Sequence, residues 1–289
     1  MKSKHFWILG IVGLGLMLSC FGCQPADSKL VAAGIGVSDL ERSTDFYTRV
    51  MGMKVKTCMR QKDLEQVVLE FVDSKGSDVV LLHYTDDRNP NYTNNPDKLV
   101  FYVPDAYALA AAIAAEGLRI VSPPKAQPTM GNVVVGIATD PDGYWIEMVQ
   151  EPTLAVAYLG AVGIGVNDLE ASADFYTRVM GMTEQYRLKI PYLMDEIILQ
   201  YAHEGGGSAV VLMHYLAPKN YTDLPLKLTF ALNDPRATLG AIEEEGLEIL
   251  VAPKGKAKFT PATYGLAKDI DGYLVEILQS VEMVPPAKQ

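Results

Sequence analysis

The chain has 289 residues, of which 49% are hydrophobic and 21% are charged, and its formal net charge is −10 at pH 7. This composition is typical of globular proteins with a substantial core, and it excludes an intrinsically disordered chain. The acidic balance argues against a nucleic-acid partner, because a protein that binds a phosphate backbone needs a basic surface. The length is enough for two domains of ordinary size.

The N-terminus is typical of a bacterial export signal. Two lysines precede an apolar segment, residues 6–18, which is too short for an ordinary membrane span. Two cysteines follow, Cys20 and Cys23, and a small residue before a cysteine at this point resembles the lipobox of bacterial lipoproteins. We expect lipidation at Cys23, with Cys20 as the alternative, and a location on the periplasmic side of the cell envelope. A cleaved signal without lipid and an uncleaved anchor are the other interpretations.

The rest of the chain contains a single cysteine, Cys58. One thiol cannot form an internal disulfide, so the fold must be held by other interactions. We expect Cys58 to be a small core residue.

An internal repeat organises the chain after the signal. Residues 45–53 recur without change as residues 174–182, and the flanking segments agree at the same offset. A repeat this long indicates a duplicated domain, because solenoid repeats are about 20 to 50 residues long. The expected organisation is a signal peptide at 1–23, a tether at 24–29, a first module at 30–151, a second module at 156–281 and a C-terminal tail at 282–289.

Each module repeats one order of elements twice. A strand at residues 30–37 precedes a helix that begins at the capping sequence 38–41 and ends at Gly52. The remaining elements of the first module are expected as strands at 53–60, 66–72 and 78–84, a strand at 98–103, a helix at 106–116, and strands at 118–121, 133–139 and 144–150. Each module therefore contains two βαβββ motifs, and the fold class is α+β.

These motifs resemble the vicinal oxygen chelate superfamily, which includes bleomycin resistance proteins and extradiol dioxygenases, and glyoxalase I (lactoylglutathione lyase) is the member most similar to them. The resemblance is carried by residues 37–43, 46–53 and 140–147, each echoed in the second module. It implies two tandem modules, each of paired βαβββ motifs with curved mixed sheets. It is weak evidence for function, because the same scaffold hosts isomerases, dioxygenases and antibiotic-binding proteins.

The resemblance also implies a divalent metal bound by His or Gln, Glu, His and Glu from four strands, a set that leaves open positions for a substrate. Carried over one by one, these positions are Ala32, Val80 or Leu81, Lys98 and Glu147 in the first module, and Ala161, Val211 or Leu212, Lys227 and Glu276 in the second. Alanine and valine cannot bind a metal, and lysine would first have to lose its proton against a reference pKa of about 10.4. We therefore expect no cofactor, and ion pairs that join Lys98 to Glu147 and Lys227 to Glu276, whichever module supplies each partner. The arginine that would hold glutathione is replaced by Gly36 and Gly165.

Strand alternation predicts which side chains share a face. If the sheets curve as in the family, one hollow in the first module is lined by Ala32, Gly34, Gly36, Lys98, Val100, Tyr102, Trp145, Glu147 and Val149, and the second module offers Ala161, Gly163, Gly165, Lys227, Thr229, Ala231, Leu274 and Glu276. The small residues either leave room for a ligand or let the larger side chains fill the space. His83 and His214 end the fourth strands, and one register would turn them inward as an altered metal site with Glu147 and Glu276.

Two functional hypotheses follow. The first is a lipid-anchored protein that binds a small molecule without a metal, through Lys98, Glu147, Lys227, Glu276, Tyr102 and Trp145. The alternative is a metal-dependent lyase or dioxygenase of the glyoxalase superfamily that uses atypical ligands. A purely structural role for the duplicated scaffold is a third interpretation.

Overall fold

The computed structural model describes residues 28–86, 96–128, 131–202, 207–221, 224–254 and 264–280. The expected signal peptide, with Cys20 and Cys23, and the expected C-terminal tail lie outside these ranges. Within the described ranges, no helix has the length and apolar character needed to cross a membrane.

The elements follow the order that the repeat predicts. The first module contains β1 (Lys29–Gly36), α1 (Leu40–Asp45), the π-helical turn η1 (Phe46–Val50), β2 (Lys54–Gln61), β3 (Leu64–Glu70), β4 (Asp78–Tyr84), β5 (Lys98–Val103), α2 (Ala106–Ala115), β6 (Ile120–Gln127), β7 (Val133–Thr139) and β8 (Trp145–Gln150). The second contains β9 (Tyr158–Gly165), α3 (Leu169–Arg178), β10 (Thr183–Ile190), β11 (Met194–Gln200), β12 (Ala209–Tyr215), β13 (Leu226–Leu232), α4 (Pro235–Glu244), β14 (Ile249–Lys254), β15 (Tyr264–Lys268) and β16 (Leu274–Gln279).

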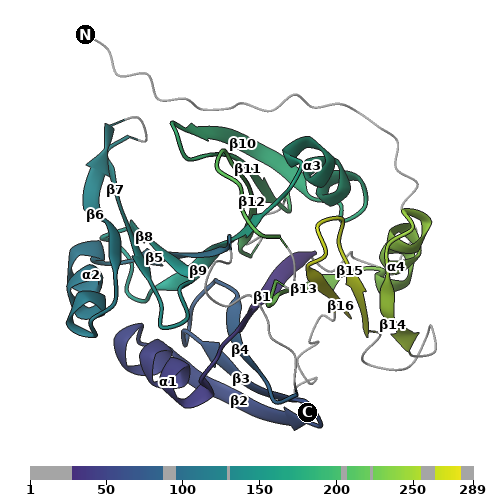
Figure 1. The fold of residues 1–289 in the computed structure, drawn as a ribbon, viewed down its shortest axis with the longest axis horizontal. Coiled ribbons are helices and arrows are strands. Elements are labelled where there is room, and N and C mark those ends of the chain that lie inside the picture. Colours follow the sequence, from purple (N-terminus) through teal and green to yellow (C-terminus); the bar gives the residue numbers. More distant parts are fainter. Residues whose placement is uncertain are drawn as a thin grey trace, which may run out of the picture.

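The strands form two curved, eight-stranded mixed sheets, and each sheet combines motifs from both modules (Figure 1). Sheet A has the order β14-β15-β16-β13-β1-β4-β3-β2, and sheet B has the order β10-β11-β12-β9-β5-β8-β7-β6. The two motifs of each sheet join through antiparallel pairs, β1 with β13 in sheet A and β5 with β9 in sheet B. The α+β fold of paired βαβββ motifs is confirmed.

This pairing changes the composition of the two expected hollows. Gly34 lies opposite Lys227 in sheet A, and Gly163 lies opposite Lys98 in sheet B. The sequence left open which modules pair to form each hollow, and the structure shows that each hollow draws on both modules. The motifs are so alike in sequence that their order along the chain does not determine which of them pair.

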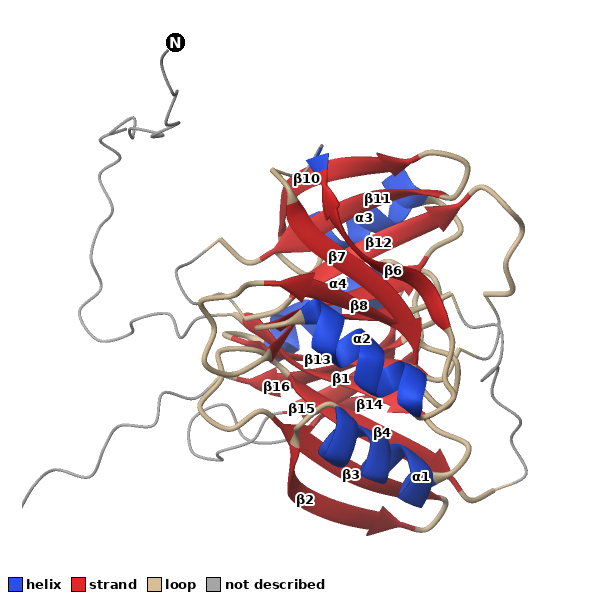
Figure 2. Cartoon of the chain, turned by 90° about the vertical axis from the view of Figure 1, so that its left-hand side faces the viewer, coloured by secondary structure: helices blue, strands red, loops and turns tan. Residues whose placement is uncertain are grey.

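The helices lie against the outer faces of the sheets, where the main apolar core is buried (Figure 2). Each helix is capped by an aspartate whose carboxylate accepts backbone N–H bonds of the first turn: Asp39, Asp105, Asp168 and Asp234. The first helix of each module is also tied to the turn before the module's last strand. The Tyr47 hydroxyl donates to Asp140 at 2.9 Å, and the Tyr176 hydroxyl donates to Asp269 at 2.6 Å.

Two edge strands differ from the sequence-based expectation. Cys58 is exposed, since all eight residues of the edge strand β2 are exposed, and its expected core position is wrong. The other strand, β6, is longer than expected and continues through two prolines, with a register shift between Ser122 and Lys125. Prolines are tolerated there because β6 is also an edge strand.

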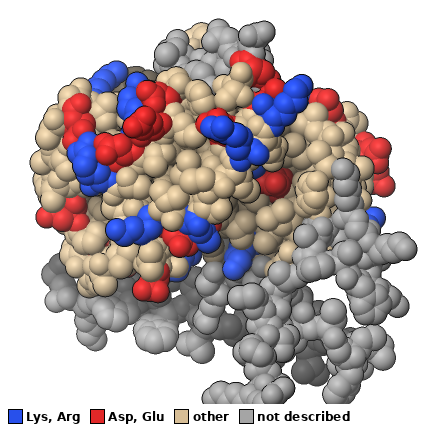
Figure 3. Space-filling view, turned by 90° about the horizontal axis from the view of Figure 1, so that it is seen from below, with Lys and Arg blue, Asp and Glu red and all other residues tan. Residues whose placement is uncertain are grey.

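Short contacts connect sheet A to sheet B beside the hollow of sheet B. Isolated bridges join Leu30 to Ser208 and Ser77 to Leu159, and the Ser77 backbone N–H donates to Ser208 Oγ at 3.1 Å. These contacts hold the β3–β4 loop, which carries Lys75, against β9. The outer surface mixes both charges, and the face in Figure 3 shows no extended basic area.

Candidate functional site

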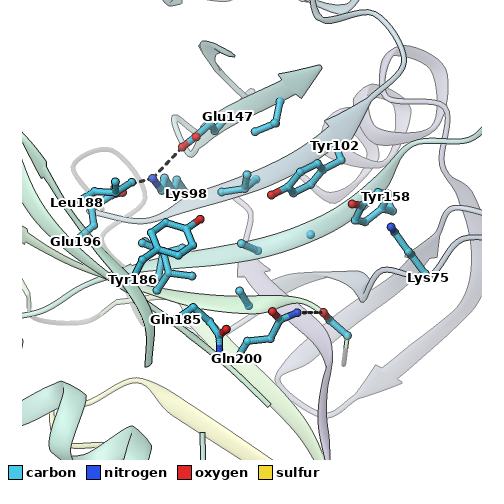
Figure 4. Close-up of a pocket in the computed structure, with 18 residues that line it drawn as sticks. Lys75, Lys98, Tyr102, Glu147, Tyr158, Gln185, Tyr186, Leu188, Glu196 and Gln200 are labelled. Atoms are coloured by element: carbon cyan, nitrogen blue, oxygen red, sulfur yellow. Dashed lines mark hydrogen bonds and ion pairs between the residues drawn. The ribbon is translucent and has the colours of Figure 1, made fainter. Parts of the chain in front are cut away.

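The hollow of sheet B contains a buried cluster of one lysine and two glutamates (Figure 4). Lys98 Nζ lies 2.8 Å from Glu147 Oε2 and 2.7 Å from Glu196 Oε1. The side chains of Lys98 and Glu196 are each 4% exposed, and that of Glu147 is 17% exposed. The structure thus brings together Lys98 and Glu147, which the sequence expected as a pair, and adds Glu196 from β11 of the second module.

The neighbouring strand makes room for the lysine. A Cβ atom on Gly163 in β9 would lie 2.5 Å from Lys98 Cγ, so a larger residue there would clash with the lysine stem. The small residues of this strand therefore allow the lysine to fold over them. They also leave open space beyond the lysine. The small residues therefore both leave room for a ligand and let a larger side chain fold in, which are the two alternatives that the sequence left open.

Electrostatics keep the lysine charged. Burial lowers the pKa of Lys98, but Glu147 and Glu196 raise it by more, so that the pKa stands above its ordinary value. Burial raises the pKa of Glu196, and Lys98 opposes this rise. With both carboxylates ionised, one positive and two negative charges give the cluster a net charge of −1.

A cavity of about 550 Å³ lies above the cluster. Its lining comes from β5 and β8 of the first module, from β9 to β12 of the second, and from the β3–β4 loop of sheet A. The polar and aromatic lining side chains beyond the cluster are Lys75, Tyr102, Tyr158, Gln185, Tyr186 and Gln200. Figure 4 places Tyr186 at the Lys98 end and places Tyr102, Tyr158 and Lys75 at the other end.

The second end of the cavity is built around a tyrosine pair. The rings of Tyr102 and Tyr158 stack with centroids 4.9 Å apart and planes 5° apart, and Lys75 Nζ lies 4.5 Å from the Tyr158 centroid. Gly160 lies beside this pair, and a Cβ there would be 2.4 Å from the Tyr102 ring. Burial raises the pKa of Tyr102 and of Tyr158 to about 12, so both phenols are neutral near pH 7.

Sheet A contains a reduced version of the cluster. Lys227 Nζ lies 2.7 Å from Glu276 Oε2, and the two side chains are 14% and 28% exposed. Thr229 also donates to Glu276, at 3.1 Å. Gln66 in β3 occupies the position that Glu196 has in β11, because Gln66 pairs with Leu82 of β4 as Glu196 pairs with Met213 of β12.

The residues at the family's metal positions do not fit a metal ion. Val80 and Val211 face the hollows, beside Ala32 and Ala161 respectively, whereas Leu81 and Leu212 lie in the main core. The first and fourth strands therefore supply no ligand, and an ammonium lies between the two carboxylates that remain in sheet B. In the part of the chain that the structure describes, no group of three or more His, Cys, Asp or Glu side chains could hold a metal.

The alternative metal set of His83, His214, Glu147 and Glu276 is not assembled. His83 shares the face of Leu81, away from the hollow, and its Nδ1 lies 3.0 Å from the Val37 carbonyl. His214 repeats this contact at 3.2 Å with Val166. Glu147 and Glu276 lie in different sheets. The outward register of the histidines is therefore the one observed.

The remaining candidates divide between the cavity and its surroundings. Tyr102 lines the cavity, whereas Trp145 is partly buried and packs edge-on against Tyr215 with centroids 6.3 Å apart. Glu196, Tyr186 and Lys75 were not identified from the sequence. A signal existed for Glu196, which is a charged residue that alternates with the apolar Met194 and Ile198 on one face of β11.

Comparison with known proteins agrees with this architecture. A model of the Glyoxalase/Bleomycin resistance protein/Dioxygenase superfamily matches residues 29–148 and residues 158–277. A lactoylglutathione lyase of Neisseria meningitidis is 33% identical over 130 residues, which are 43% of this chain and 91% of that protein. A lactoylglutathione lyase of Oryza sativa is 27% identical over 209 residues, covering 67% of this chain and 68% of the relative.

Solved structures show the same fold. Glyoxalase I from Zea mays has a TM-score of 0.72 at 24% identity, over 88% of this chain and 92% of that chain. A putative dioxygenase from Bacillus subtilis has a TM-score of 0.63 at 13% identity, over 90% and 87% of the two chains. The chain belongs to the Glyoxalase/Bleomycin resistance protein/Dioxygenase superfamily, whose model it matches twice in tandem.

Proposed function

We propose that this protein binds a small organic molecule in the cavity of sheet B, without a metal ion. The observation that carries the proposal is the Lys98 ammonium, which occupies the family's metal position between Glu147 and Glu196 beneath a cavity of about 550 Å³. Such a volume suits a drug-sized ligand, and aromatic walls with a few converging polar groups are typical of binding sites. The relatives named lactoylglutathione lyase do not extend that activity to this chain, because the donor set does not fit their metal.

We also propose that lipid holds the protein at the periplasmic side of the bacterial cell envelope. This rests on the apolar segment at residues 6–18 and the lipobox-like cysteine Cys23. An exported binding module would meet molecules that enter or leave the cell.

A cavity-filling variant tests the binding proposal. Ala161 forms part of the cavity lining, and Ala32 is its counterpart in the hollow of sheet A. The neutral dye N-phenyl-1-naphthylamine, which fluoresces in apolar sites, should bind the unlipidated chain saturably at one site. Ala161→Leu should weaken this binding at least tenfold, and the matched variant Ala32→Leu should leave it unchanged.

Metal should have no part in this binding. Addition of Ni²⁺ or Zn²⁺, or of a chelator, should leave the dye affinity unchanged. Dye binding that is not saturable, that responds equally to both leucine variants, or that requires metal would contradict the proposed function.

A further inference from the structure

We infer that the occupant of the sheet B cavity is an organic cation, with an ammonium group on a ring-containing body. The inference rests on the proposed function, because it names the ligand class of the same cavity. Its basis is the charge of the lining and the contrast between the two sheets.

The lining has an unequal distribution of charge. Among the lining residues that the structure describes, the charged ones are Lys75, Lys98, Glu147 and Glu196. Both carboxylates lie at the Lys98 end, where one ammonium cannot neutralise both (Figure 4). Lys75 lies at the opposite end, is exposed, and already contacts the Tyr158 ring. Solvent therefore screens Lys75 far more than it screens the buried cluster.

The carboxylates also keep acceptor capacity. Lys98 contacts Oε2 of Glu147 and Oε1 of Glu196. These two contacts do not involve Oε1 of Glu147 or Oε2 of Glu196. An ionised carboxylate can accept about four hydrogen bonds. A ligand ammonium placed between the second oxygens would complete the charge balance of the cluster, and a ligand carboxylate there would be repelled.

Tyr186 supplies a surface suited to the same ligand. Its ring lines the cavity at the Lys98 end, and Glu147 and Glu196 act on it electrostatically, contributing after burial to the raised pKa of its phenol. A cation near such a ring is attracted to the ring face. The aromatic walls then accommodate a flat organic body beside the charged group.

The hollow of sheet A contains the equivalent cluster with balanced charges. Its Lys227 and Glu276 balance each other, and neutral Gln66 replaces the second carboxylate. The positions of Tyr102 and Tyr158 correspond to Ala231 and Lys29 in sheet A, as the pairing of β1 with β13 repeats that of β9 with β5. A second carboxylate beside the lysine is therefore present in the cluster of sheet B and not at the equivalent position of sheet A.

Three indole compounds that differ in charge test the inference: tryptamine, indole-3-ethanol and indole-3-acetate. Their affinities are measured by displacement of N-phenyl-1-naphthylamine and by calorimetry, at pH 7.5 and 150 mM salt. We expect tryptamine to bind at least tenfold more tightly than the neutral alcohol, and the anion to bind most weakly. A tenfold preference corresponds to about 1.4 kcal/mol, which one added pair of opposite charges near a protein surface can supply.

The variant Glu196→Gln gives sheet B the residue that sheet A has. Its free energy of unfolding in urea should show an intact fold, while its preference for tryptamine over the neutral alcohol falls below about threefold. The matched variant Glu276→Gln in sheet A should keep the full preference. If the dye binds but the three indoles compete equally, if the anion competes best, or if millimolar tryptamine neither displaces the dye nor gives heat, the cation inference is wrong while the proposed function stands. Failure of the dye and the cavity-filling tests would instead count against the proposed function.

Discussion

Replacing Lys98 with methionine tests whether this ammonium holds together the cluster that the two modules share in sheet B. The substitution keeps the unbranched stem of the side chain, one atom shorter, but leaves Glu147 and Glu196 near each other without a counter-charge. Removing one partner of a buried ion pair typically costs 3 to 5 kcal/mol. We expect a loss near 3 kcal/mol in the free energy of unfolding, because the 17% exposure of Glu147 gives water partial access.

Lys227→Met is the matched control in sheet A. Its pair is 14% and 28% exposed and involves one carboxylate, so the expected loss is about 1 kcal/mol. The double variant Lys98→Met with Glu196→Gln should recover more than half of the loss of the single variant, because one buried negative charge has been removed. Urea unfolding monitored by circular dichroism gives these free energies, provided that the unfolding free energy of each variant depends on urea concentration with the same slope.

The loss caused by Lys98→Met should also depend on pH. Burial raises the pKa of Glu196 and Lys98 opposes the rise, so this pKa should increase further in the variant. The folded variant then binds a proton at a pH where the unfolded chain does not, and its stability relative to the parent should recover as the pH is lowered. Equal losses for Lys98→Met and Lys227→Met, no recovery in the double variant, and no dependence on pH would refute the reasoning.

Further outcomes are expected elsewhere in the molecule. Phe46→Ala should reduce stability by about 3 to 5 kcal/mol, because Phe46 is buried under the first helix, and an unchanged melting temperature would contradict this. Tyr176→Phe should cost about 1 to 3 kcal/mol by leaving buried Asp269 without its hydroxyl donor, and a loss within 0.3 kcal/mol of zero would show that the bond is not stabilising. Intact-mass measurement of the mature protein should show a start at Cys23 with acyl chains, whereas an unmodified start further along the chain would end the lipoprotein proposal.

The repeated motif made most of the fold predictable. The identity of residues 45–53 and 174–182, with the alternation of the strands around them, predicted four βαβββ motifs, and the resemblance to the family placed Lys98 beside Glu147, on what are neighbouring strands. Both follow from local periodicity and from the resemblance. The exposure of Cys58 did not follow, since an edge strand and a covered strand can have similar sequences.

The candidate site was only partly predictable because it is assembled across the two modules. Pairing of β5 with β9 brings Glu196 to Lys98, although the two residues lie far apart in the sequence. Contacts between Ser77 and Leu159 then bring Lys75 to the same cavity. These are tertiary arrangements that no local pattern encodes.

Metal content is the most direct measure of the central claim, that Lys98 occupies the place of the metal. The protein is purified without chelators, either as the mature lipidated form or as a soluble form without lipid. Elemental mass spectrometry should then find far less than one zinc, nickel, manganese or iron ion per chain. Its melting temperature should be unchanged by chelation. One metal ion per chain, with a melting temperature that falls on chelation and returns with metal, would contradict the claim.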